Sequence, residues 1–225
     1  MDEIRVTIDG KQLSGHPGMT ILELARENGI DIPTLCYRPE LSLLGACRIC
    51  VVEVEGSRTL VGSCHTPITP GMVIHTHSPK VLETRKVIVE LLLASHCGAC
   101  FMCDKANICE LRQVAAELEV GLPRFEIKKR YYPIEDVSPY IERNLSKCVL
   151  CRRCVRACRQ IAKRDLFAVA YRGFDAKVVV DSDRALDKEA CRDCDICISF
   201  CPTGALSKPR KLSEEKKGKP LVITS

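Results

Sequence analysis

The sequence predicts an α+β fold in which short strands and helices surround groups of cysteines. Residues 4–8 alternate apolar and polar side chains, as a half-buried strand does. Residues 81–92 repeat apolar side chains at helical spacing. Sixteen cysteines stand among 225 residues that include no Trp, five Tyr and five Phe. The cores must therefore be aliphatic or held together by metal.

The first 35 residues are typical of a hairpin followed by a helix. The alternating strand ends at the turn pair Asp9-Gly10, and KQLSGHPG continues as a second strand. Thr20 and Glu23 have the spacing of a capping box at the start of ILELAREN. Two strands and a helix in this order predict a β-grasp domain at the N-terminus.

Four cysteines follow this pattern, separated by gaps of 10, 2 and 13 residues. The first gap is longer than in the plant-type [2Fe-2S] spacing. Gly45 and Ala46 leave room for backbone amides to approach the sulfurs, which favours a cluster. A structural zinc site is the alternative, and the preceding β-grasp pattern favours [2Fe-2S]. The predicted ligands are Cys36, Cys47, Cys50 and Cys64.

The stretch HCGACFMCDKANIC, residues 96–109, lies between two predicted helices and contains a second group of ligands. Three thiols and one imidazole can hold an iron-sulfur core, and zinc accepts the same set. Cys97 offers an all-thiolate alternative to His96, so the spacing leaves both the metal and the fourth ligand open. The set with the imidazole is His96, Cys100, Cys103 and Cys109.

The most specific signal is an internal repeat of Cys-x2-Cys-x2-Cys-x3-Cys, followed the second time by Pro202. In bacterial two-cluster ferredoxins, the fourth cysteine of each run binds the cluster of the other run. A zinc site would not explain why both runs contain a fourth cysteine at the same spacing. The repeat predicts two [4Fe-4S] clusters, one held by Cys148, Cys151, Cys154 and Cys201, the other by Cys191, Cys194, Cys197 and Cys158.

Two positions in the repeat depart from the usual ferredoxin pattern. Arg152 and Asp195 follow the second cysteine of their runs, where Gly is frequent. The backbone at these two positions therefore lacks the conformational freedom that Gly would provide. Histidines after Cys64 invite a further metal prediction, but we expect surface or packing roles for His65, His75 and His77.

Composition excludes several other classes of protein. The N-terminus has no secretory signal, so we expect a cytoplasmic protein in which disulfides are not formed. No apolar run reaches eighteen residues, so we expect no membrane span. The net charge of +5 could suggest nucleic acid, but the sequence is poor in aromatic stacking residues. Fifteen thiolates on four clusters would add roughly −7 and leave the loaded protein near −2.

The lines GIDIPTLCY and GACRICVVEVEG resemble the [2Fe-2S] domain at the N-terminus of the large iron-sulfur subunit of respiratory complex I and of NAD-linked hydrogenases and formate dehydrogenases. The middle region is similar to that family's cluster with one His and three Cys ligands, which implies iron held by His96 rather than by Cys97. The likeness extends from residue 1 to about 207. It implies the diaphorase-side iron-sulfur subunit of a bidirectional or electron-bifurcating hydrogenase.

The function that follows is electron transfer through one [2Fe-2S] and three [4Fe-4S] clusters. The sequence has no G-x-G-x-x-G after a strand, no P-loop and no nucleophile elbow, so we expect no substrate site of its own. The resemblance implies that FMN and NAD(P) lie in an NAD(P)H-oxidising partner, and that a hydrogenase or dehydrogenase subunit, or a soluble ferredoxin, is the other partner. The alternatives are a formate dehydrogenase or other flavin-based subunit, a free ferredoxin-like carrier and a zinc-dependent interaction protein.

The predicted organisation has three metal-binding domains joined by a linker and followed by a basic tail. We expect a [2Fe-2S] domain, a helical His/Cys3 domain, a linker, a two-[4Fe-4S] ferredoxin-like domain and the tail at 1–78, 79–123, 124–138, 139–207 and 208–225.

Overall fold

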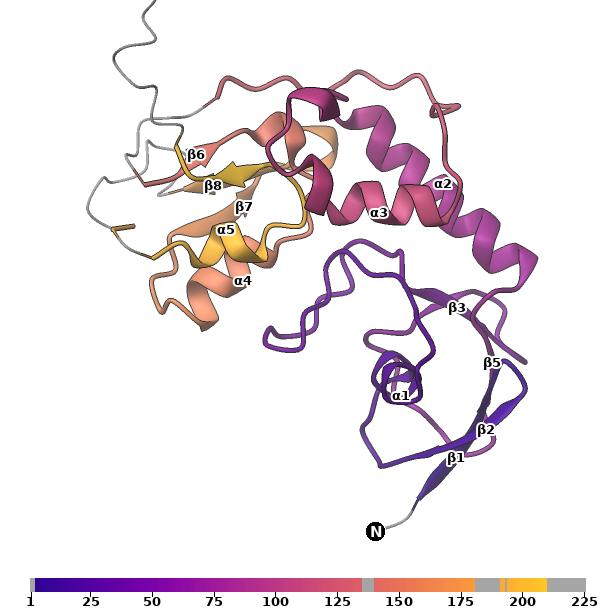
Figure 1. Ribbon diagram of the computed structural model, residues 1–225. Coiled ribbons are helices and arrows are strands. Elements are labelled where there is room, and N and C mark those ends of the chain that lie inside the picture. Colours follow the sequence, from indigo (N-terminus) through magenta and orange to yellow (C-terminus); the bar gives the residue numbers. More distant parts are fainter. Residues whose placement is uncertain (1–2, 135–139, 181–190, 193, 210–225) are drawn as a thin grey trace, which may run out of the picture.

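A computed structural model describes residues 3–134, 140–180, 191–192 and 194–209. Figure 1 shows an α+β molecule in which a small mixed sheet with α1 lies at one end and the ferredoxin-like part at the other. Two helices, α2 and α3, lie between them (Figure 1). The first part, the N-terminal module, contains β1 (Ile4–Ile8), β2 (Lys11–Gly15), α1 (Ile21–Glu27), β3 (Val51–Val54), β4 (Val61–Gly62) and β5 (Val73–His75).

The sheet of the N-terminal module has the order β2-β1-β5-β3-β4. The predicted hairpin is confirmed, because β1 and β2 pair antiparallel with Ile8 opposite Lys11. Asp9 and Gly10 in its turn both have positive φ, as a two-residue type I′ turn requires. β5 returns parallel to β1, and β3 pairs antiparallel with β5 and β4.

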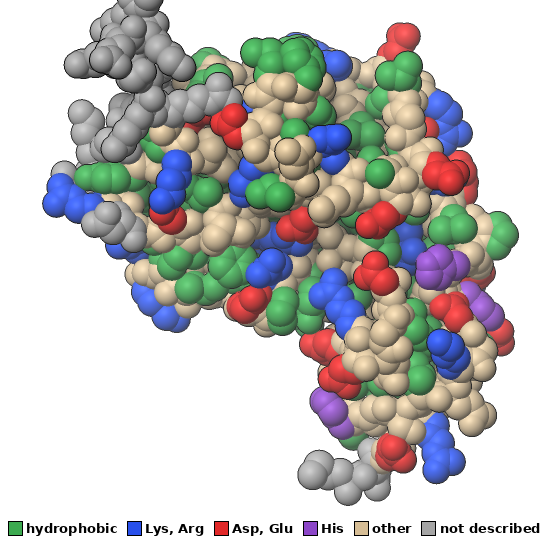
Figure 2. Space-filling view, viewed as in Figure 1, with side chains coloured by type: hydrophobic (Ala, Val, Ile, Leu, Met, Phe, Trp, Pro, Cys, Tyr) green, Lys and Arg blue, Asp and Glu red, His purple; other side chains and the backbone are tan. Residues whose placement is uncertain are grey.

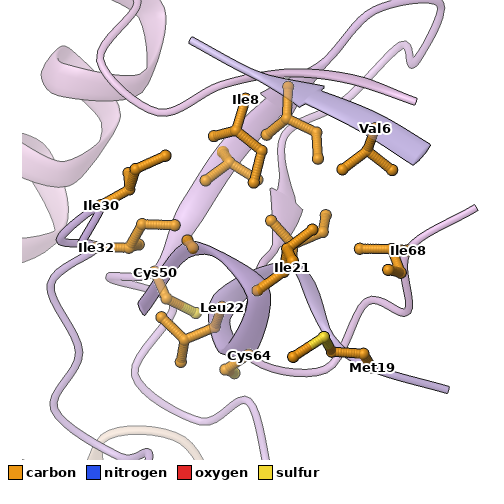
Figure 3. Close-up of a cluster of buried hydrophobic side chains, with 14 of the residues drawn as sticks. Val6, Ile8, Met19, Ile21, Leu22, Ile30, Ile32, Cys50, Cys64 and Ile68 are labelled. Atoms are coloured by element: carbon orange, nitrogen blue, oxygen red, sulfur yellow. The ribbon is translucent and has the colours of Figure 1, made fainter. Parts of the chain in front are cut away.

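The helix α1 packs its apolar face against this sheet. The predicted capping box is confirmed: the Thr20 hydroxyl accepts from the Glu23 amide at 3.3 Å, and the Thr20 amide donates to the Glu23 carboxylate at 2.9 Å. Figure 3 shows side chains of α1 and the sheet meeting in one core that also contains two of the predicted ligand thiols. Labelled members of that core are Val6, Ile8, Ile21, Leu22, Cys50 and Cys64.

The helical module consists of two α-helices and the turns between them. Ser78 caps the first helix by accepting from the Val81 amide at 3.3 Å, and His96 is its C-cap residue. The predicted place of His96 just past a helix is therefore confirmed. The elements are α2 (Pro79–Ser95), η1 (Cys100–Met102), η2 (Ala106–Ile108) and α3 (Glu110–Glu117).

The helical module shares its core with the cysteine loop of the N-terminal module. Leu35 and Ile49 of that loop are fully buried against Val89 and Leu111. A buried guanidinium adds a polar contact, since Arg85 of α2 donates to a backbone carbonyl of β3 at 2.8 Å. The first two modules are therefore packed together rather than tethered.

The ferredoxin-like module is built on two small antiparallel sheets, β6 with β9 and β7 with β8. The run of valines in KVVVDSD is typical of a strand, and it forms one as far as Val180; its last three residues lie outside the described residues. The elements are β6 (Glu142–Arg143), η3 (Leu145–Lys147), α4 (Arg153–Gln160), β7 (Phe167–Ala170), η4 (Gly173–Asp175), β8 (Lys177–Val180), α5 (Ile196–Phe200) and β9 (Leu206–Ser207).

Arg152 and Asp195 adopt a backbone conformation that is usually found for Gly at these positions of the two cysteine runs. Each is the N-cap of its helix, and each has left-handed φ, 59° and 41°. For a residue other than Gly this conformation costs about 1–2 kcal/mol. Both runs therefore turn from loop into helix through a strained residue.

A buried arginine, Arg153 of α4, joins all three modules. Its side chain is 2 % exposed and donates to both carboxylate oxygens of Glu110 in α3, at 2.6 and 2.8 Å. The same guanidinium donates to the carbonyl of Tyr37 in the N-terminal module at 3.1 Å. One side chain thus touches three modules.

Two further residues on the same face of α4 hold the N-terminal module. Arg156 donates to the carbonyls of Cys36 and Ser42. Gln160 exchanges hydrogen bonds with Ser42, accepting from its amide at 2.9 Å and donating to its hydroxyl at 2.6 Å. We call Arg153, Arg156 and Gln160 the α4 clamp.

We predict that Arg153→Met weakens the contact between the modules. It leaves the Tyr37 carbonyl and the Glu110 carboxylate without their donor, at a cost of roughly 2–4 kcal/mol because Glu110 is partly solvated. Native-state hydrogen exchange should show faster opening in the Tyr37 and Glu110 segments. Arg159→Met is the matched control, since Arg159 lies on the same helix in an exposed pair with Asp165. Equal protection in both variants would contradict the clamp.

Candidate iron-sulfur sites

The structure brings the first predicted set of thiols together between α1, β3 and β4. Cys36, Cys50 and Cys64 are buried and Cys47 is half-buried. The Cys36 sulfur accepts from the thiols of Cys47 and Cys64, which lowers the pKa of Cys36. The thiol of Cys64 also lies beside Cys50 and lowers the pKa of Cys50 to about 6. All four sulfurs therefore meet at one place.

The loops that carry these thiols are held by backbone contacts rather than by large side chains. The amide and the hydroxyl of Ser63 both donate to the Cys50 carbonyl, at 3.0 and 2.8 Å. Arg156 of the α4 clamp holds the Cys36 carbonyl from the other side. The positions of these thiols thus depend on two modules.

The second predicted set lies on the turns between α2 and α3. The thiols of Cys100 and Cys103 are close enough to raise the pKa of Cys109, although burial is the larger cause. The imidazole of His96 is turned toward the backbone, since its Nδ1 accepts from the Gly98 amide at 3.1 Å and lies 3.8 Å from the Cys97 sulfur. The structure thus associates three thiols and places both candidates for the fourth ligand at the same loop.

His96 can bind a metal only through an unprotonated ring nitrogen, so the protonation state of its imidazole matters. Burial, with Lys147 and Lys129 nearby, lowers its pKa and favours the neutral ring. Binding through Nδ1 uses the lone pair that faces Gly98, and binding through Nε2 requires the proton on Nδ1. Either mode would replace the hydrogen bond from Gly98.

The turns of the second site pack directly on the ferredoxin-like module. A Cβ added to Gly204 would lie 2.5 Å from the Cys103 sulfur, so only Gly fits against that thiol. Lys105 donates to the carbonyls of Ile198 and Cys201 at 2.9 and 3.2 Å. The second site and the cysteine runs are therefore immediate neighbours.

The third set surrounds one apolar cavity in the ferredoxin-like module. Three thiols of the first run and one thiol of the second run line it together with aliphatic side chains and Phe167. Burial raises the pKa of Cys148 to about 11, and the Cys201 thiol adds to this effect. The four lining cysteines are Cys148, Cys151, Cys154 and Cys201.

The fourth set follows the same crossed arrangement. Burial is the main reason why the pKa of Cys197 is raised to about 12. The neighbouring thiols of Cys191, Cys158 and Cys194 raise it further, in that order of effect. Cys201 contributes least, although it is in the same run as Cys197. The structure therefore places Cys158 of the first run with the thiols of the second.

The donor groups fit iron-sulfur clusters. All sixteen cysteines are free thiols. Burial raises the pKa of five ligand thiols outside the first set, among them Cys151, whose pKa is raised to about 12, and Cys109. Such thiols ionise only beside a strong positive charge, which cluster iron would provide. Among the described residues, no three His, Cys, Asp or Glu side chains are arranged as they would be around a single ion. The ligand assignment itself stays a prediction.

Sequence reasoning missed the residues that position these sites. Arg153, Arg156 and Gln160 recur at helical spacing on one face of a helix whose other face carries Cys154 and Cys158. A stripe of hydrogen-bonding Arg and Gln side chains opposite a stripe of thiols is a signal that could have indicated the α4 clamp. Within the described residues, no helix combines the length and apolar character needed to cross a bilayer.

Three family models match successive parts of the chain. Residues 1–79 match a 2Fe-2S iron-sulfur cluster binding domain. Residues 85–124 match the NADH-ubiquinone oxidoreductase-G iron-sulfur binding region. Residues 138–207 match the ferredoxin-like domain of NADH-quinone oxidoreductase subunit 3.

Similar proteins include subunits of hydrogenases. NADP-reducing hydrogenase subunit HndD from Solidesulfovibrio fructosivorans is 39 % identical over 92 % of the chain, which spans only 36 % of that relative. The gamma subunit of the NAD-reducing hydrogenase HoxS from Cupriavidus necator is 31 % identical over 92 % of the chain and 88 % of its own length. A chain in the crystal structure of an NAD+-reducing [NiFe]-hydrogenase in the H2-reduced state matches with TM-score 0.78 and 29 % identity, over 91 % of this chain and 86 % of that one.

We predict that the two cysteine runs exchange their fourth ligands. Cys158→Ala should damage mainly the cluster of Cys191, Cys194 and Cys197, because the structure places Cys158 beside those thiols. Electron paramagnetic resonance of the reduced protein measures which signal is lost. Cys201→Ala is the reciprocal control and should damage the other cluster. If Cys158→Ala removed only the cluster of the first run, the crossed assignment would be wrong.

We also predict that His96 rather than Cys97 is the fourth ligand of the second site. Cys97→Ala should then leave every cluster in place. His96→Ala should lose this cluster or, if Cys97 replaces the imidazole, keep it at a lower reduction potential, because a thiolate adds negative charge. Nitrogen hyperfine coupling from labelled histidine tests the bond directly. An absent coupling, together with loss of a cluster in Cys97→Ala, would contradict the assignment.

Proposed function

Because the chain belongs to the family of iron-sulfur electron-transfer subunits of NAD(P)-reducing hydrogenases and complex I-like enzymes, we propose that it relays single electrons between a flavoprotein and a hydrogenase catalytic subunit. The flavoprotein would carry FMN and oxidise NAD(P)H. The comparisons confirm the resemblance of the sequence to this family. The cluster count and the identity of both partners belong to the proposal.

The observation that carries the proposal is the match with the gamma subunit of HoxS, which is covered over 88 % of its length. HndD, in contrast, is much longer than the matched part. A relative that the chain covers over most of its length is therefore a subunit of an NAD-reducing hydrogenase. The matches with NADH-quinone oxidoreductases of Rhizobium meliloti and Rickettsia bellii favour a complex I-like enzyme as the second candidate.

The contacts between the modules also support a relay. The predicted ligands would be Cys36, Cys47, Cys50 and Cys64 for one [2Fe-2S] cluster and the other three sets for [4Fe-4S] clusters, which supply one-electron transfer when bound. The α4 clamp fastens the Cys36 loop to the helix that carries Cys154. Gly204 places the Cys103 thiol against the ferredoxin-like module. The protein thus holds its ligand sets in one continuous body.

Exposed apolar side chains favour a subunit over a free carrier. Phe101, Met102 and Ile108 are 87 %, 66 % and 66 % exposed on the loop that carries the second ligand set. Figure 2 shows hydrophobic side chains along the upper edge of the molecule, where Figure 1 draws this loop and the segment after α3. Apolar surface gathered in this way is typical of a face that another protein covers.

We predict that the anaerobically purified chain contains about 14 iron and about 14 sulfide, as one [2Fe-2S] and three [4Fe-4S] clusters require. It should not pass electrons from NADH or NADPH to a dye, because hydride chemistry needs a flavin. Purification from the native organism should yield FMN and NAD(P)H-to-dye activity together with the chain.

Each measurement separates one alternative from the proposal. A colourless protein with stoichiometric zinc would refute the cluster assignment. Turnover of NADH by the pure, FMN-free chain would refute the absence of a substrate site. A cluster-loaded chain that purifies from its native source without a flavoprotein, even after mild cross-linking, would indicate a free carrier.

A further inference from the structure

His65 lies directly over the first ligand set without belonging to it. Its Nδ1 is 3.6 Å from the sulfur of Cys64, which is within hydrogen-bond range for sulfur. Cys64 is 1 % exposed, whereas the imidazole is on the surface. The ring therefore forms the outer wall of the Cys64 thiol.

The neighbouring Arg48 determines which ring nitrogen carries the proton. Its guanidinium is 3.5 Å from Nε2 of His65. A guanidinium has only N–H donors, so Nε2 has to be the acceptor. In a neutral imidazole the proton then lies on Nδ1, which donates toward the Cys64 sulfur.

Two glycines provide the space in which the ring lies. A Cβ added to Gly62 would be 2.3 Å from Cε1 of the imidazole and 2.9 Å from the Arg48 guanidinium. A Cβ added to Gly45 would be 3.0 Å from Nδ1 of the ring, and Gly45 has φ +65°. Neither glycine can be replaced without moving the imidazole away from its present position.

We propose that His65 is a positioning residue that raises the reduction potential of the [2Fe-2S] site by donating an N–H···S hydrogen bond to Cys64. The inference rests on the proposed ligand set of this site. Reduction places more negative charge on the cluster and its sulfurs, so a donor to a sulfur stabilises the reduced form more than the oxidised form. Arg48 fixes the tautomer that donates, and Gly45 and Gly62 seat the ring.

The decisive variant is His65→Leu in the full-length, cluster-loaded chain. Leucine still covers the Cys64 sulfur but cannot donate. The midpoint potential of the [2Fe-2S] signal, followed by electron paramagnetic resonance during a redox titration, should fall. A tenfold change in the reduction equilibrium, which is the size we expect, corresponds to ~59 mV for one electron.

A second variant displaces the ring without removing it. Gly62→Ala keeps His65 and Arg48 but fills the space that the imidazole occupies, so its potential should fall as well. His65→Asn retains an N–H donor and should recover part of the wild-type potential. The matched control is His75→Gln, because His75 lies on β5 and pairs with Glu55 at 2.9 Å, away from the thiols.

A spectroscopic readout identifies the hydrogen bond itself. After exchange into deuterated water, the reduced [2Fe-2S] signal should show deuterium coupling from the Nδ1 position. The coupling should vanish in His65→Leu and persist in His75→Gln. An unchanged potential and an unchanged coupling in His65→Leu and Gly62→Ala would overturn the proposal. A wild-type chain with no [2Fe-2S] signal would instead overturn the ligand set on which it rests.

Discussion

The arrangement of the three modules depends on one buried cation. The guanidinium of Arg153 is 2 % exposed, and its contacts are the Glu110 carboxylate and the Tyr37 carbonyl. A buried charge is costly unless such partners surround it, and each partner here comes from a different module. Separating any two modules would therefore strip the cation of part of its compensation. This makes the relative placement of the modules specific.

The loops that carry the predicted ligands contain few helices or strands. Contacts with neighbouring segments therefore determine their conformation. Ser63 holds the Cys50 carbonyl from within the same module, and Arg156 of α4 holds the Cys36 carbonyl. The Cys103 turn is held against Gly204, where any side chain would collide with the sulfur. Loops that bind clusters must keep several thiols in place at once, which a free loop cannot do. Here each loop gains its order from the neighbouring module.

Local patterns were predictable from the sequence because they depend on neighbouring residues. Examples are the turn at Asp9-Gly10, the capping box of Thr20 and Glu23, and the end of α2 before His96. The α4 clamp was not predictable in the same way, because Arg153 and Tyr37 are far apart in the sequence and their contact depends on tertiary packing. The seat of His65 was missed for the same reason, since two glycines with no motif of their own create it.

The sequence suggested that the basic excess balances the clusters, and the structure shows where part of this charge lies. Arg85 and Arg156 have pKa values lowered by burial, an effect opposed by the thiol of Cys50 for Arg85 and by Cys36 for Arg156. Each arginine therefore gains from a negative charge at the site beside it. Thiolates bound to iron would supply that charge permanently. Cluster loading and burial of the arginines should therefore support each other, because the cations that order the ligand loops are stabilised by the charge that those loops come to hold.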